Sequence, residues 1–264
     1  MTMISRMRRV AVLAVATGAL AATAACGEDT AAGESPAQEP SAGPTATGDA
    51  GGPDDAVDGD RLYFYPPVSD AVLTISSDAG TPDSTVTVVG VDEGADGQTV
   101  RIRQEIPGAD QIDIEAAFTA AGDGSLVLEF DMFLLGLTPL LEQAEEMTVT
   151  ASGDDMVIPA IEDMESGATT EGEAVIEMSV EGFVLRNESA WTVRGSGYES
   201  VTTALGTFDA YVVDVDLSLE SSMGPSAEGA IRYWFVPGFG WVRQQTTIDD
   251  ISMTHEISAS TVAP

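Results

Sequence analysis

Alternation of apolar and polar residues with a period of two dominates the chain from residue 61 onward, and this pattern constrains the fold most. Between Tyr211 and Leu219 every second residue is apolar, while Asp214, Asp216 and Ser218 lie between them. Successive side chains of a strand point to opposite faces, so such a strand has one apolar and one wetted face. The pattern therefore predicts an antiparallel sheet rather than a parallel sheet that is buried on both faces.

The clearest hairpin is predicted around Ala121-Gly122-Asp123-Gly124. Apolar residues alternate over 111–118 and again over 126–132, and the Asp-Gly pair suits a tight turn. Further strands are expected at 85–91, 99–106, 147–151, 174–180, 191–193, 208–219, 230–235 and, with a break, 242–257. Thr138-Pro139 and the residues after it favour a helix near 138–147, and a second short helix could begin near Pro159. The fold class predicted is mainly β with one or two short helices.

Charge excludes one class of partner. The chain has 44 acidic residues, ten Arg and no Lys. Three of the Arg and none of the acids precede Cys26, so a chain cleaved there would carry 7 − 44 = −37. Such a surface repels phosphate backbones, so nucleic acid is not expected as a partner. Most of these carboxylates are expected to solvate the surface.

The N-terminus has the pattern of an export signal. A cationic stretch, Met1 to Arg9, precedes thirteen small or apolar residues, Val10 to Ala22. This is too short for a bilayer core of about 30 Å, which needs roughly 20 residues, but it is typical of a signal peptide.

The end of this segment resembles the lipobox of bacterial lipoproteins, which consists of Leu, a small residue, Gly or Ala, and then Cys. Ala24, Ala25 and Cys26 match it, and Thr23 departs from the usual Leu. The resemblance implies that Cys26, the only cysteine, carries a diacylglycerol with fatty acids such as palmitate. This lipid would anchor the chain to the extracytoplasmic face of the cell membrane, and two acyl chains hold firmly where one does not.

Three parts follow from these patterns. Residues 1–25 are expected to be the signal peptide and 61–262 the β domain. Residues 26–60 comprise the lipidated cysteine and a tether with nine acids, no base and no aromatic residue. Because such a composition cannot bury enough apolar surface, the tether is expected to be disordered.

The C-terminal half is similar to a group of bacterial secreted and lipid-anchored β-rich domains. The resemblance lies in Gly206-Thr207-Phe208 and in the run Tyr233 to Arg243, which reads YWFVPGFGWVR. Tyr63-Phe64-Tyr65-Pro66 is similar to the opening Y-F-P of that group. The resemblance implies a curved antiparallel sheet or half-barrel, distantly like lipoprotein carriers, and implies no enzymatic activity.

An aromatic cluster is the main candidate for a binding surface. Its members are expected to pack in the core, and the alternative is a patch that contacts a ligand or partner. These residues are Tyr233, Trp234, Phe235, Phe239 and Trp241.

The residues that carry most chemistry are scarce. The single histidine, His255, shares parity with Ile251, Met253 and Ile257, which predicts a core histidine with a hydrogen-bond partner. With one His and one Cys, a His/Cys zinc site is not possible, and no nucleophile motif is present. Residues 92–97 predict a hairpin turn rather than a calcium loop. No catalytic residue, metal site or cofactor is therefore expected.

The function expected is that of a non-enzymatic, lipid-anchored extracytoplasmic lipoprotein with a ligand- or partner-binding β domain. Its partners would be the membrane, through Cys26, and an extracytoplasmic ligand or protein that the sequence does not identify. One alternative is a carrier of lipid or another hydrophobic molecule with a cavity in a half-barrel. The other alternative is a metal-dependent hydrolase.

Overall fold

The computed structural model describes residues 61–106, 112–128, 147–180, 183–222, 225–249 and 251–264. Within these ranges the chain forms thirteen strands and one short helix. The elements are β1 (Val72–Ser77), β2 (Ser84–Glu93), β3 (Gly97–Ile106), β4 (Ile112–Ala121), β5 (Leu126–Leu128), β6 (Met147–Gly153), β7 (Met156–Ile158), α3 (Ile161–Glu165), β8 (Thr169–Val180), β9 (Phe183–Thr203), β10 (Gly206–Ser221), β11 (Ala227–Val236), β12 (Gly240–Ile248) and β13 (Ile251–Ser260).

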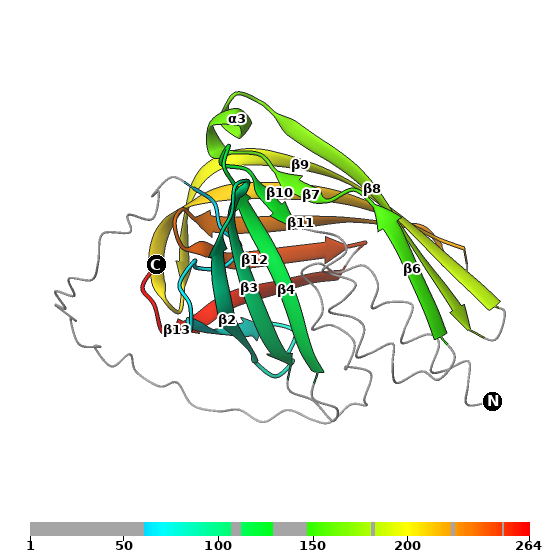
Figure 1. Ribbon diagram of the computed structural model, residues 1–264, viewed down its shortest axis with the longest axis horizontal. Helices are drawn as coiled ribbons and strands as arrows, with labels where there is room; N and C mark the ends of the chain where they lie inside the picture. The colour runs from blue at the N-terminus through cyan, green and yellow to red at the C-terminus, as the bar shows by residue number, and fades with distance from the viewer. Residues whose placement is uncertain (1–60, 107–111, 129–146, 181–182, 223–224, 250) are drawn as a thin grey trace.

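All thirteen strands belong to one antiparallel sheet with the order β6-β8-β9-β10-β11-β12-β13-β1-β2-β3-β4-β5-β7. The sheet is strongly curved, so that the half containing β2–β4 folds across the half containing β10–β13 (Figure 1). The last strand of this order, β7, also contacts β8, the second strand, because the Thr170 hydroxyl on β8 donates to the Val157 carbonyl on β7. The expected curved antiparallel sheet with a short helix is confirmed.

The core lies on the concave face and follows the predicted alternation. On β10, Tyr211, Val213 and Val215 are fully buried, and their partners on β11 are equally buried. Burial of each large apolar side chain contributes about 1.5–3 kcal/mol relative to exposure, so this face drives the folding of the domain.

The predicted hairpin around residues 121–124 is confirmed. Phe118 on β4 lies opposite Leu128 on β5, and the Ala121 amide donates to the Ser125 carbonyl at 2.7 Å. Gly124 has a φ of 88°, a conformation that favours glycine. Part of the second predicted strand, 129–132, lies outside the described residues.

Several boundaries differ from the sequence prediction. β9 extends over 21 residues, Phe183–Thr203, rather than 191–193, because it pairs with both β8 and β10. The expected break in 242–257 lies between β12 and β13, where Asp249 has a φ of 51°. The short helix expected near Pro159 is α3. Of the helix expected near 138–147, residues 138–146 lie outside the described residues, and Met147 is the first residue of β6.

Candidate functional site

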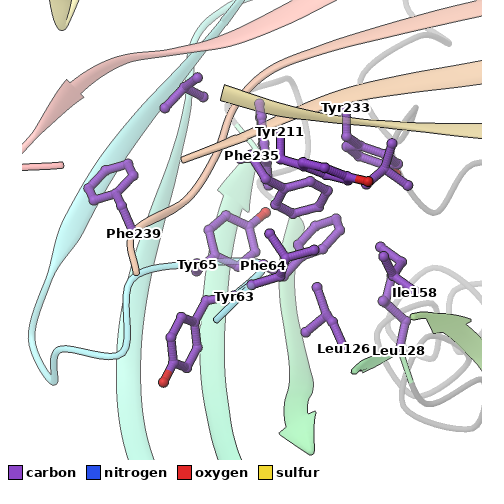
Figure 2. Packing of buried hydrophobic residues seen from close by; sticks show 14 of the residues in the cluster. Tyr63, Phe64, Tyr65, Leu126, Leu128, Ile158, Tyr211, Tyr233, Phe235 and Phe239 are labelled. Carbon is purple, nitrogen blue, oxygen red and sulfur yellow. The ribbon is translucent and has the colours of Figure 1, made fainter. Parts of the chain in front are cut away.

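Four of the five aromatic residues singled out in the sequence lie in the core. Tyr233, Phe235, Phe239 and Trp241 are all buried. Tyr233, Phe235 and Phe239 lie around Tyr63–Tyr65 of the opening segment, Leu62–Tyr65 (Figure 2). All four residues of the opening segment are buried. A ligand-contacting role for these four side chains stays a prediction.

Phe64 is the centre of this aromatic cluster. Its ring stacks on Phe118 with the centroids 4.5 Å apart and the planes 7° apart. It also makes edge contacts with Tyr233 at 5.6 Å, Phe235 at 6.1 Å and Trp241 at 6.5 Å. Such edge and offset contacts add to the apolar burial of each ring. Phe64 thus joins β4 to the closing hairpin formed by β11 and β12.

The turn of the closing hairpin is fitted to the backbone of the opening segment. Gly238 donates its amide to the Arg61 carbonyl at 2.9 Å. Gly240 has a φ of 140°, and a Cβ there would lie 2.9 Å from the Phe64 carbonyl oxygen and 3.1 Å from the Tyr65 Cα. The glycines of the Pro237–Gly240 turn therefore allow the start of the domain to pack tightly against its last hairpin.

The fifth aromatic residue, Trp234, lies on the opposite face of β11 and is half-buried. Its indole N–H donates to Glu199 Oε2 at 3.1 Å, and the Arg232 guanidinium lies 5.4 Å from its ring centroid. Arg232 also donates to Glu199 Oε1 at 3.0 Å. Trp234 thus has the opposite parity to Tyr233 and Phe235 and belongs to a charged network on the outer face, although it still packs against the edge of the core.

An open depression with a volume of about 700 Å³ crosses β8, β9, β10 and β11. Trp191 and Leu217, which are opposite each other on β9 and β10, line it together with the glycines Gly172 and Gly229. Its lining also includes five carboxylates, from Asp154, Glu171, Glu173, Asp216 and Glu228. Asp216 accepts an ion pair from Arg194, which partly offsets this negative charge.

A row of buried polar side chains lies on β11, β12 and β13, and it shares only β11 with the depression. Tyr233 on β11 lies opposite Gln244 on β12, and Gln244 lies opposite His255 on β13. Their exposed fractions are 1%, 2% and 4%. The Gln244 amide donates to the Thr246 hydroxyl at 3.0 Å. This polar row, Tyr233–Gln244–His255, was not predicted, although Gln244 and Thr246 occupy the apolar parity of their strand between Val242 and Ile248.

His255 is buried, as its parity predicts, but Ile251 on the same strand is 73% exposed because it lies at the start of β13. The expected hydrogen bond of His255 is absent among the described residues, where neither ring nitrogen has a partner. The Tyr233 hydroxyl is likewise without a partner in this part of the chain. Burial lowers the pKa of His255, and the Asp78 carboxylate opposes this shift. Burial also raises the pKa of Tyr233.

The residues that could hold a metal ion do not gather in the described ranges, where no group of three His, Cys, Asp or Glu was found. Residues 92–97 form the β2–β3 turn, in which the Gly94 amide donates to the Gly97 carbonyl at 2.8 Å. The Asp92 carboxylate there accepts from Arg101 Nε at 2.9 Å.

Cys26, the expected lipidation site, lies outside the described residues. No helix in the described ranges has the length and apolar character that a membrane span requires.

The fold is shared with two solved bacterial proteins. One is a candidate lipoprotein from Parabacteroides distasonis ATCC 8503, with a TM-score of 0.55 and 19% identity, covering 76% of this chain and 100% of that one. The other is a candidate exported protein with a YmcC-like fold from Bacteroides fragilis NCTC 9343, with a TM-score of 0.54 and 16% identity over the same shares. No curated protein sequence matches the chain. Residues 78–248, more than half of the chain, match the DUF3108-like family, and the protein therefore belongs to that family.

Proposed function

We propose that the protein is a non-enzymatic lipoprotein, held by a lipid on Cys26 at the extracytoplasmic face of the cell membrane, whose β domain binds a ligand or a partner. The observation that carries the proposal is the position of the only cysteine, directly after a short apolar segment with a cationic stretch before it. The fold supports it, because two proteins with this fold are a candidate lipoprotein and a candidate exported protein.

The way the domain begins also suits a tethered protein. The tether of residues 26–60 would enter the fold at Arg61, whose carbonyl accepts from Gly238, and the next residues are buried against the closing hairpin. A pull transmitted along the tether would therefore act on a segment that is fixed in the core rather than on a loose end.

Binding is supported by the shape of the sheet. The depression of about 700 Å³ is large enough for a small ligand or for a side-chain cluster of a partner. The rings of the aromatic cluster around Phe64 pack against one another, so a ligand would not lie between them.

The anchor is tested by expressing the wild-type chain and Cys26→Ala in a bacterial host and following both by detergent-phase partitioning. Wild type should partition with detergent, whereas Cys26→Ala should appear in the aqueous phase or keep its leader. Thr23→Leu serves as a matched control because it completes the lipobox pattern and should preserve or increase processing. Unchanged detergent partitioning of Cys26→Ala would contradict the proposal.

The runner-up function is a carrier of lipid or another hydrophobic molecule. The buried apolar residues of β10 and β11 on the concave face favour this carrier function. Native mass spectrometry of the purified protein separates the two, since a carrier should retain a lipid in its interior and a partner-binding domain should not.

A further inference from the structure

The polar row is an unusual feature for the inside of a sheet. Tyr233, Gln244 and His255 project from three adjacent strands toward the same face, where directly opposed residues have Cβ atoms about 4.5–5.5 Å apart. The row is enclosed by apolar neighbours on the same strands, among them Ile231 and Ile257, which are 1% and 0% exposed. A sheet that needed only stability would carry apolar side chains here.

The row retains unused hydrogen-bonding capacity. Among the described residues, the Tyr233 hydroxyl and both ring nitrogens of His255 have no partner, although the two residues are 99% and 96% buried. Buried polar groups in native proteins are nearly always paired, and an unpaired one destabilises the fold. Unpaired groups that persist at such positions point to a partner outside the described part of the chain.

The chemistry of the row selects the kind of partner. Burial lowers the pKa of His255, so the ring is neutral at pH 7 and offers one donor and one acceptor, as a tyrosine hydroxyl also does. The arginines nearest in sequence, Arg232 and Arg243, are both engaged by carboxylates. Arg232 and Arg243 also have the opposite parity to Tyr233 and Gln244, so no guanidinium from their strands faces the row. An anion would therefore be buried without a counter-charge, which is strongly unfavourable.

We propose that Tyr233, Gln244 and His255 form an enclosed binding site for the uncharged hydroxyl or amide group of a molecule that is otherwise apolar. This site would define the ligand class of the proposed binding function, and the inference rests on that function. Hydrogen bonds from the ligand to His255 and Tyr233 would satisfy the unpaired atoms, and the apolar remainder would contact the surrounding aliphatic side chains.

The site is tested with a photoreactive probe on the full chain purified in detergent. The probe is 1-decanoylglycerol with a diazirine in its acyl chain, which combines a neutral diol with an apolar tail. Decanoate with the same diazirine-bearing tail is the anionic comparison. Labelled peptides are identified by mass spectrometry, and intact mass on the same preparation reports separately whether Cys26 carries its lipid.

We expect the decanoylglycerol probe to label peptides from β11–β13 of the wild-type chain and the decanoate probe to label them far less. His255→Phe, which removes both nitrogens at similar volume, should reduce labelling by about tenfold, the effect of losing hydrogen bonds in an enclosed site. Tyr233→Phe should reduce it to a smaller extent. Tyr211→Phe is the matched control, because Tyr211 is equally buried but lies outside the row, and labelling should stay at the wild-type level.

Thermal unfolding of the same variants excludes a merely structural role. If these polar atoms are unpaired in the ligand-free protein, His255→Phe and Tyr233→Phe should unfold at or above the wild-type temperature, because each substitution removes an unpaired buried group. The proposal is overturned if both variants unfold well below wild type, if all variants are labelled equally, if decanoate labels as strongly as decanoylglycerol, or if wild type is not labelled. In each of these cases a normal lipid mass on Cys26 would leave the proposed anchoring intact.

Discussion

Gly240 and His255 are single positions at which the fold depends on unusual local chemistry. At Gly240 the backbone of the closing hairpin lies so close to that of the opening segment that no side chain fits. At His255 an ionisable ring is only 4% exposed. Each position gives a prediction that concerns one side chain.

Gly240→Ala should destabilise the domain by about 2–4 kcal/mol. An alanine at this position would have to keep a φ of 140°, which is strained for a residue with a side chain. Its Cβ would also lie 2.9 Å from the Phe64 carbonyl oxygen, a backbone atom that cannot rotate away. Gly80→Ala is the matched control, since Gly80 also has a positive φ, 72°, but a Cβ there meets nothing within 4 Å. Urea unfolding should show the larger loss for Gly240→Ala. Equal losses would mean that contact with the opening segment contributes nothing.

The free energy of unfolding should fall as the pH is lowered through the range near 6.5, the ordinary pKa of histidine. Burial lowers the pKa of His255 in the folded protein, so the unfolded chain takes up a proton first and is favoured at acid pH. Urea titrations between pH 5.5 and 7.5 should show a steeper loss for wild type than for His255→Phe. Identical slopes would show that the ring is not held neutral by the fold.

Among the elements, alternation predicted most of the long strands, including β6 and the β12–β13 region, but it did not predict β1 or the three-residue strand β7. Alternation located β2, β3, β4, β10 and β11 within a few residues. On β2, β3, β10 and β11 the core part of the strand buries every second side chain. β9 was underestimated because runs of polar residues and glycine at 186–189 and 194–197 interrupt the alternation on either side of 191–193. Backbone pairing with β8 and β10 holds these parts of the strand, and alternation does not report such pairing.

The candidate site shows the same limit of the sequence. His255 could be placed on the buried face from its parity, and it is buried there. The sequence could not show that Gln244 and Tyr233 lie beside His255, because the register of β11, β12 and β13 depends on the hairpin turns and their bulges. The opening segment was recognised only as a motif, and its insertion between β4 and the closing hairpin required the three-dimensional structure.

The whole molecule combines a stable sheet with a very large negative charge, −34 for the full chain. The ion pairs on its outer face, such as Arg194–Asp216, are between exposed side chains and each contributes little. Self-repulsion among the unpaired carboxylates therefore opposes the compact state.

Salt should stabilise the protein as a consequence. Raising NaCl from 0.1 M to 1 M shortens the screening length from about 10 Å to about 3 Å and weakens this repulsion. The melting temperature should rise by several degrees, and choline chloride at equal ionic strength should have a similar effect. A melting temperature that falls with salt would show that attractive ion pairs dominate instead.

The central claim concerns the chemistry of one thiol, and the mass of the mature N-terminus tests it most directly. Peptide mass analysis of the membrane-bound protein should find Cys26 as the first residue, carrying a diacylglycerol on its sulfur. A chain that retains residues 1–25, or one that begins at Cys26 with a free thiol, would contradict the account of a lipid-tethered extracytoplasmic domain.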